Sequence, residues 1–332
     1  MGKLINGKWL DDTQLIEYET QQYQQSDGHF QRGTAAFRSW VTKDGSAGPT
    51  GAAGFTAQIG RYHLYAAINC PWAHRTLIYR QLKQLELVVS LSLVKPLRTD
   101  HGWVFDTSES RFTDDVYGYT ALHQLYSKAA ADYTGRVTVP VLWDKQEQTI
   151  VSTESAEIIR MFNTAFNDIT GDTQDFYPAQ LANEIDELNN YIYSNLNNGV
   201  YQTGFARSQN AYNESVTKVF AALDQLEQRL SSHRYLLGDQ LTEADWRLLP
   251  TLVRFDVGYF SAFKCNLKAL QDYAHLSRYL KDLCSHSGVA STIELDIYRR
   301  GYHSVSTLRN PHGIVPLGFE SQFLEPLPIQ QT

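Results

Sequence analysis

The pattern of apolar and polar positions first indicates a strand that runs directly into a helix. An alternating apolar run from Tyr62 to Ile68 predicts the strand. The helix is indicated by apolar residues on one face, at Leu77, Ile78, Leu82 and Leu85. Between them the chain reads Asn69-Cys70-Pro71-Trp72-Ala73-His74-Arg75. Cys70 is therefore expected where the strand turns into the helix, with Pro71 in the first turn, where its missing N–H costs nothing.

The same pattern predicts further strands and a second helix. Residues 87–93 are almost all Val, Leu and Ser and predict a second strand. Residues 136–143 predict a third, with Pro140 at its start, where proline is tolerated and is often cis in a tight turn. Residues 149–162 predict a short strand followed by a helix that begins near Glu154-Ser155.

The second half of the chain has helical periodicity over residues 178–300. Three helices are marked by apolar residues at helical spacing: Ile185, Leu188, Ile192 and Leu196; Val216, Phe220, Leu223 and Leu230; Leu276, Leu280 and Leu283. Thr242-Glu-Ala-Asp245 is a capping-box variant at a helix start, which we interpret as a folding device. Pro250 lies in the helix that begins at this capping box and should kink it.

The pattern divides the chain into four parts. Residues 1–58, rich in Gln, Gly, Ser and Asp, are expected to be a loop-rich N-terminal extension. Residues 59–168 carry the strands and should form an α/β domain, interrupted by an aromatic insert over about residues 98–134. Residues 175–303 should form an all-helical domain, and residues 304–332 an irregular C-terminal tail.

Composition narrows the functional classes. The chain has 332 residues, enough for two domains, and its 42% hydrophobic and 20% charged content is ordinary for a globular protein. We expect no transmembrane helix, signal peptide or myristoylation site, and three widely spaced cysteines favour a reducing compartment such as the cytoplasm. The net charge of the chain is −7 and its basic residues are scattered, so we do not expect it to bind nucleic acid. The ten histidines lack metal-binding spacing, so no metal is expected.

The predicted order of elements resembles that of the thioredoxin-like domain of glutathione transferases. It is a strand, Cys70 and a helix, then a second strand, a third strand at Pro140, a fourth strand, and a helix that begins at Glu154-Ser155. Five motifs in order are similar to those of the glutathionyl-hydroquinone reductases, the Xi class of that family. They are Cys70-Pro-Trp-Ala-His-Arg75, Gly135-Arg-Val-Thr-Val-Pro-Val-Leu-Trp-Asp144, Leu241-Thr-Glu-Ala-Asp-Trp-Arg-Leu248, Phe263-Lys-Cys-Asn266 and Asn310-Pro-His-Gly-Ile-Val-Pro316. The resemblance covers residues 30–318, and in the family a long N-terminal segment wraps the catalytic domain.

The resemblance implies a thioredoxin-like N-terminal domain, an all-α C-terminal domain and glutathione as co-substrate. By the same resemblance, Val139 should bond the cysteinyl backbone of glutathione through its own N–H and C=O. Glu154 and Ser155 should hold the γ-glutamyl end, where the helix N-terminus also suits a carboxylate. Trp103 and Arg136 should flank the tripeptide, with Arg136 as a carboxylate partner.

Cys70 is the candidate nucleophile, because a helix N-terminus stabilises a thiolate. Position 73 is Ala, so Cys70 would form a mixed disulfide that an outside thiol must resolve. In the resembling family, tyrosines matching Tyr201 and Tyr302 line the hydroquinone pocket. Gly301 stands where the family often has an aromatic residue or His, which alters the fine shape of that pocket.

Alternatives remain at this point. A lone Cys before Pro is commonly a small buried residue, and Cys265 and Cys284 are interpreted in that way. The nearest enzyme alternative is an omega-like thiol transferase or dehydroascorbate reductase. The other is a non-catalytic scaffold of glutathione-transferase type, against which the presence of Cys70, Val139-Pro140 and Glu154-Ser155 together argues. A homodimer is expected by resemblance.

Overall fold

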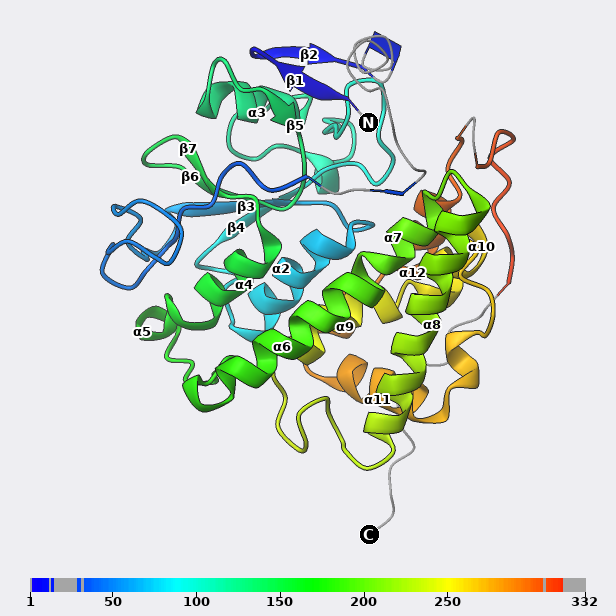
Figure 1. Ribbon diagram of the computed structural model, residues 1–332. Helices are drawn as coiled ribbons and strands as arrows, with labels where there is room; N and C mark the ends of the chain where they lie inside the picture. The colour runs from blue at the N-terminus through cyan, green and yellow to red at the C-terminus, as the bar shows by residue number, and fades with distance from the viewer. Residues whose placement is uncertain (1, 12, 15–28, 31–32, 307–308, 319–332) are drawn as a thin grey trace. The chain divides into compact units, whose positions relative to one another are not determined.

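The structure is a computed structural model that describes residues 2–11, 13–14, 29–30, 33–306 and 309–318. The chain divides into two units, and each is considered by itself. The first unit contains the described residues up to 14 and residues 33–174. The second contains residues 29–30 and the described residues from 175 onward. Figure 1 shows strands in the first unit and helices throughout the second.

The first unit is built on a four-stranded mixed sheet in the order β4-β3-β6-β7. Its strands are β3 (Tyr62–Ala66), β4 (Ser90–Leu93), β6 (Val141–Asp144) and β7 (Thr149–Ser152). β3 is parallel to β4 and antiparallel to β6, which is antiparallel to β7. Helices α2 (Pro71–Leu82) and α4 (Ser155–Thr164) pack together on one face of this sheet (Figure 1). This is the thioredoxin-like arrangement that the sequence predicts.

Two predicted strands differ from the observed ones. The second begins at Ser90 instead of Leu87, because the amides of Val88 and Val89 turn back to the Leu85 carbonyl. The prediction for residues 136–143 is wrong in its first half, since β6 begins only after Pro140. Proline has no N–H to give to the ladder, so it stands outside the strand.

The N-terminus contributes a small sheet that the sequence analysis did not predict. β1 (Lys3–Ile5) and β2 (Lys8–Leu10) form a hairpin, and β5 (Gly135–Arg136) pairs with β1. The turn is Asn6-Gly7, with φ values of 47° and 74°, the left-handed pair that two-residue hairpins favour. The hairpin fixes the segment that leads to Val139 and Pro140.

The insert covers the other face of the main sheet. It contains the 3₁₀ turn η1 (Ser110–Phe112) and helix α3 (Leu122–Ala129), which Figure 1 shows on the side opposite α2 and α4. The Tyr65 hydroxyl of β3 donates to Asp114 at 2.9 Å, and the Tyr65 and Phe105 rings lie 5.9 Å apart. The insert is thus ordered by packing against the sheet. Helix α5 (Asn167–Thr170) follows α4.

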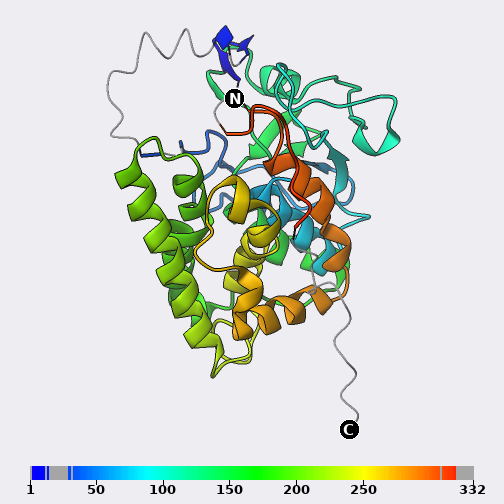
Figure 2. The same ribbon diagram turned by 90° about the vertical axis from the view of Figure 1, so that its right-hand side faces the viewer.

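The second unit consists of helices joined by loops, which agrees with the predicted all-helical domain (Figure 2). Its helices are α6 (Ala182–Ile192), α7 (Gly199–Gly204), α8 (Gln209–Leu230), α9 (Glu243–Leu252), α10 (Phe260–Ala262), α11 (Ala274–Ser285) and α12 (Leu295–Tyr302). Short 3₁₀ turns are η2 (Ala179–Leu181), η5 (Leu270–Asp272) and η6 (Ala290–Thr292). Two segments are π-helical, η3 (Tyr193–Asn197) before α7 and η4 (Phe255–Tyr259) after α9. Such turns are frequent at functional sites.

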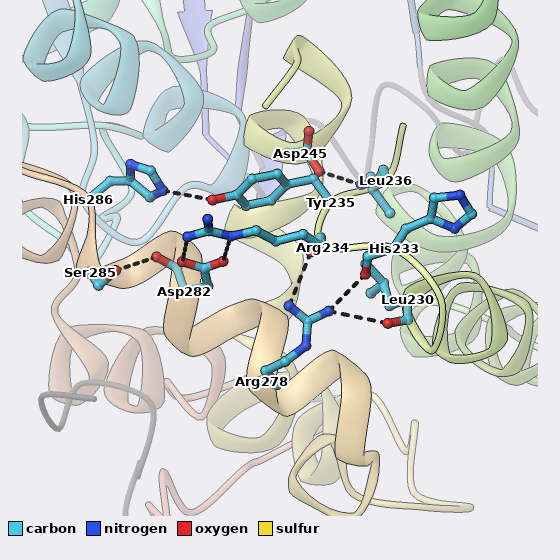
Figure 3. Close-up of polar contacts among 10 residues, drawn as sticks. All are labelled: Leu230, His233, Arg234, Tyr235, Leu236, Asp245, Arg278, Asp282, Ser285 and His286. Carbon is cyan, nitrogen blue, oxygen red and sulfur yellow. Dashed lines mark hydrogen bonds and ion pairs between the residues drawn. The ribbon is translucent and has the colours of Figure 1, made fainter. Parts of the chain in front are cut away.

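The Thr242–Asp245 cap forms at the start of α9 as predicted. Asp245 accepts from the Thr242 amide at 2.8 Å, from the Tyr279 hydroxyl at 2.9 Å and from the Leu236 amide at 2.9 Å, the last drawn in Figure 3. These bonds tie α9 to α11 and to the segment after α8. Pro250 lies inside α9, which ends at Leu252.

A second polar cluster joins the end of α8 to α11 (Figure 3). Arg234 makes a two-nitrogen contact with Asp282, with N–O distances of 2.8 and 3.1 Å. Arg278 donates to the carbonyl oxygens of Leu230, His233 and Arg234. Both clusters satisfy backbone groups at helix ends, which is a structural role.

Candidate active site

Cys70 is the N-cap of α2, with extended backbone angles (φ −84°, ψ 118°) and Pro71 as the first helical residue. Its amide donates to the Ala67 carbonyl at 3.1 Å, and its carbonyl accepts the first helical bond from His74 at 2.9 Å. The side chain is partly exposed and makes no capping bond. The thiol therefore lies at the positive end of the helix dipole, as the sequence predicts.

Val139 lies beside this thiol. The Cys70 Sγ is 3.7 Å from the Val139 carbonyl oxygen, and the Val139–Pro140 peptide is cis. The Val139 amide makes no hydrogen bond with any residue that the structure describes. A buried amide without a partner is uncommon, so this backbone is suited to pair with a peptide-like ligand.

Glu154 and Ser155 lie at the start of α4. Glu154 is the N-cap, and its side chain accepts from the Ala156 amide at 3.1 Å. Ser155 is 2% exposed, and its hydroxyl has no hydrogen-bond partner among the described residues. An unsatisfied buried hydroxyl costs about 1–3 kcal/mol, which a ligand or a water would recover.

The structure does not join Trp103 and Arg136 to this group by any recorded contact. Arg136 is exposed in β5, opposite Lys3, and its guanidinium makes no hydrogen bond or ion pair with the described residues. Trp103 is half-buried in the insert, with the Arg98 guanidinium 5.4 Å from its ring centre. The exposed Arg136 is thus a cation without a carboxylate of its own in the part of the chain described.

The second unit brings its two predicted phenols into contact. The hydroxyl oxygens of Tyr201 on α7 and Tyr302 on α12 are 3.0 Å apart, although 101 positions separate them in the chain. A third phenol, Tyr259 at the end of η4, lies 3.1 Å from Tyr302. The sequence analysis missed Tyr259, because nothing in the local pattern distinguishes it among twenty tyrosines. Tyr201, Tyr259 and Tyr302 therefore form a group of three, which we call the phenol cluster.

Phe263 packs against all three members of the phenol cluster. Its ring centre is 5.3 Å from that of Tyr201 and 5.4 Å from those of Tyr259 and Tyr302. Phe263 belongs to one of the motifs that carried the family resemblance. That motif thus has a packing role beneath the phenols.

Arg254 is the second residue that the sequence analysis missed. It is fully buried, donates to the Pro250 carbonyl at 2.8 Å, and lies 3.7 Å from the ring centre of Tyr298. Tyr298 donates to the Thr292 carbonyl at 3.1 Å and lies beneath Arg254, outside the phenol cluster. A buried guanidinium next to phenols favours a negative charge near them.

Tyr302 and Tyr259 stay protonated at neutral pH. Burial raises the pKa of Tyr302 well above its ordinary value, and the charges of Tyr201 and Tyr259 raise it further, while Arg254 lowers it. Burial likewise raises the pKa of Tyr259, and Arg254 opposes this shift. The hydroxyl groups of Tyr302 and Tyr259 are therefore neutral and able to donate a hydrogen bond.

The other two cysteines are in a different environment. Cys265 and Cys284 are buried, and burial raises the pKa of each thiol to about 12. Within the described ranges, no three His, Cys, Asp or Glu side chains are grouped so that they could hold a metal ion. Among the same residues, no helix is long and apolar enough to cross a membrane.

Comparison with known proteins gives two family matches. Residues 69–165 match the model described as "Glutathione S-transferase, N-terminal domain", and residues 209–282 match "Glutathione S-transferase, C-terminal domain". The first match contains Cys70, Val139, Glu154 and Ser155, and the second begins on α8.

Three relatives resemble the chain over most of its length. Glutathionyl-hydroquinone reductase YqjG of Escherichia coli is 52% identical, covering 96% of this chain and 95% of its own. Its glutathione-bound structure has a TM-score of 0.88, with 98% of each chain covered. Glutathionyl-hydroquinone reductase PcpF of Sphingobium chlorophenolicum is 45% identical, covering 96% of each chain. The Xi-class glutathione transferase of Natrialba magadii has a TM-score of 0.87 at 40% identity, covering 98% of this chain and 96% of its own.

Proposed function

Because the chain belongs to the glutathione transferase family, among the glutathionyl-hydroquinone reductases of the Xi class, we propose that it reduces S-glutathionyl-hydroquinones through Cys70. Glutathione is the co-substrate. One observation carries the role of Cys70: it is the N-cap residue of α2, and its thiol lies beside the Val139 carbonyl. The chemistry of the reaction follows from that thiol.

In the first step the Cys70 thiolate attacks the sulfur of the glutathionyl group. A Cys70–glutathione disulfide forms, the bond between sulfur and the ring carbon breaks, and the electron pair goes to that carbon. The carbon is a workable leaving group only because a hydroquinone can react as its ketone tautomer. A proton then replaces sulfur on the ring, and free hydroquinone leaves.

In the second step the thiolate of another glutathione attacks the mixed disulfide. Oxidised glutathione forms, and Cys70 leaves as a thiolate. Two glutathione sulfurs are oxidised in total, and one ring carbon is reduced. Since position 73 is Ala, no neighbouring cysteine competes with this outside thiol.

We assign the glutathione contacts as follows. Val139 pairs with the cysteinyl backbone, since its amide has no partner among the described residues. Ser155 and the amide end of α4 receive the γ-glutamyl carboxylate, while Glu154 binds the γ-glutamyl ammonium. Trp103 and Arg136 flank the tripeptide, and Arg136 neutralises a carboxylate.

The phenol cluster supplies donors for the hydroquinone. Tyr201 and Tyr302 hydrogen-bond the ring oxygens and polarise the ketone form from which the carbon leaves. The raised pKa of Tyr302 keeps its hydroxyl protonated at neutral pH, which suits this role. Tyr259 joins them as the third phenol.

One assay tests the assignment against its alternatives. Glutathione consumption is measured with a glutathionylated hydroquinone and with dehydroascorbate, for the wild type and for Cys70→Ala. We expect activity on the hydroquinone that the variant lacks. A preference for dehydroascorbate would indicate the omega-like thiol transferase, and no activity on either compound would indicate the scaffold.

We further propose that the protein is a cytoplasmic homodimer. The reduced state of three widely spaced cysteines supports a reducing compartment. The dimer is an expectation from the family. Light scattering at micromolar concentration distinguishes a dimer from a monomer.

A further inference from the structure

The N-terminal extension adds a short strand segment to the edge of β7. The Ser39 amide donates to the Val151 carbonyl at 2.9 Å, and the Thr153 amide donates to the Phe37 carbonyl at 3.0 Å. Arg38 and Ser152 are the paired residues of this antiparallel bridge. The extension is therefore bonded to the backbone that leads directly into Glu154.

Arg38 connects this segment to the first turn of α4. Its guanidinium donates to Glu157 through Nε, at 2.8 Å, and through Nη2. The Glu157 side chain is almost fully buried, and this hydrogen bond, with the charges of Glu157 and Glu154, raises the pKa of Arg38. Thr50 of the same extension donates to the Arg38 carbonyl at 2.9 Å and lies 3.3 Å from Glu157. Charge-assisted contacts of this kind hold a fixed geometry.

The contact changes how α4 begins. Glu157 is the third residue of α4, where a glutamate ordinarily reaches back to the N-cap amide. Here Glu157 is turned toward Arg38, and the Glu154 amide is instead bonded to the Ser152 hydroxyl at 3.1 Å. A cation from the extension is thus bonded to the first turn of α4, which also contains Ser155 and follows Glu154.

We propose that Arg38 is a positioning residue for the γ-glutamyl end of glutathione. Through Glu157 it holds the first turn of α4 so that Glu154 and the Ser155 hydroxyl, which has no partner among the described residues, face the ligand. This inference rests on the proposed function, because it takes glutathione as the ligand of Glu154 and Ser155. It gives the N-terminal extension a part in substrate binding.

The test compares two ligands that differ only in the γ-glutamyl group. S-Methylglutathione and S-methyl-cysteinylglycine are both unreactive toward Cys70, and their dissociation constants are measured by calorimetry for wild type and Arg38→Met. We expect about tenfold weaker binding of S-methylglutathione by the variant, as for loss of one charge-assisted contact. Binding of S-methyl-cysteinylglycine should not change.

Lys43→Met is the matched control. Lys43 is another cation of the extension, and it pairs with Asp168 on α5 at 2.5 Å, away from the start of α4. This variant should bind S-methylglutathione as the wild type does. Equal losses in both variants would mean that the extension acts only through overall stability, which overturns the inference.

Two further variants keep the inference testable if Arg38→Met does not fold. Arg38→Lys keeps the charge but not the two-nitrogen contact, and should weaken S-methylglutathione binding to a smaller extent. Glu157→Gln should reproduce the selective loss, and combining it with Arg38→Lys should add little. Unchanged binding in both variants overturns the inference. If the wild type itself does not bind S-methylglutathione, the proposed function fails instead.

Discussion

The two units present their chemical groups in different ways. In the first unit, Cys70, Val139 and Glu154 stand at the ends of regular elements, and much of what they offer is backbone: a helix N-terminus, a peptide amide and an N-cap. In the second unit, the phenol cluster consists of side chains on three separate helical segments, and its members contact one another through their hydroxyl groups.

The comparison teaches that the two sites tolerate change differently. A backbone group remains in place whatever side chain its residue carries, so the first site depends on Cys70 and on the elements that surround it. The phenol cluster depends on each hydroxyl and on the packing of each ring. Substitution of Cys70 should therefore abolish activity, whereas substitutions in the phenol cluster should lower activity by graded amounts.

The largest effect is expected for Cys70→Ser. A serine hydroxyl is not ionised near neutral pH and does not attack sulfur, so reduction of a glutathionyl-hydroquinone should be abolished. The fold should persist, since the Cys70 side chain makes no capping bond. Turnover is measured together with a thermal melt. More than a tenth of wild-type turnover would contradict the role of Cys70.

A similar contrast is expected among the cysteines. Burial raises the pKa of Cys265 and Cys284 to about 12, whereas a thiol at a helix N-terminus commonly titrates between about 3.5 and 7.5. At neutral pH the thiolate fraction of Cys70 should exceed theirs by a factor on the order of 10³ or more. Alkylation rates between pH 4 and 9, followed by mass spectrometry of each cysteine peptide, measure this directly. A Cys70 midpoint at or above about 8.5, the value of a free thiol, would show that the helix end does not activate it.

Within the phenol cluster, Tyr302→Phe and Tyr201→Phe should each lower turnover. The two hydroxyl oxygens are 3.0 Å apart, and that of Tyr302 also lies 3.1 Å from that of Tyr259. Losing one hydrogen bond in the transition state is worth about 1–3 kcal/mol, or roughly ten- to hundredfold in turnover. Turnover should fall more than glutathione affinity in both variants. Normal turnover in both would make the phenols packing residues.

A smaller effect on turnover is expected from a substitution in η4, where the backbone packs against the Tyr302 ring. A Cβ at Gly258 in η4 would lie 2.7 Å from Tyr302 Cδ2 and 3.1 Å from its Cγ, so Gly258→Ala should displace the ring. Turnover should fall about three- to tenfold, as for a modest overpacking. In a Tyr302→Phe background the same change should cost little more, because it acts through that hydroxyl. Gly318→Ala, where a Cβ meets nothing within 4 Å, is the control.

The first unit could be predicted well from sequence, because its signals are local. An apolar run, a Cys-Pro start and a Glu-Ser start each mark the end of one element, and the strand and helix order followed from them. One error was local, because the amides of Val88 and Val89 bond to the Leu85 carbonyl and delay the start of β4, and the other came from long-range pairing. Residues 135–136 pair with a hairpin near the N-terminus instead of extending the main sheet, and no pattern within β5 indicates that partner.

In the second unit, the fold class could be predicted from the sequence, but part of the candidate site could not. Helical periodicity predicted its class, and the Thr242–Asp245 cap formed because all of its groups lie within one turn. Tyr201 and Tyr302 were predicted as site residues from the resemblance to a family. Tyr259 and Arg254 were not found, since a tyrosine at a π-helical turn and a buried arginine have no local signature.

The sequence by itself therefore determined most of the secondary structure, the thioredoxin-like order of the strands, and the position of Cys70 at a helix start. These follow from interactions over a few residues, which periodicity and capping chemistry express directly. Only the tertiary structure decided that Tyr259 joins Tyr201 and Tyr302, and that Arg38 reaches Glu157 across 119 positions of chain. Such contacts depend on how whole elements pack, and a single sequence carries no local trace of that packing.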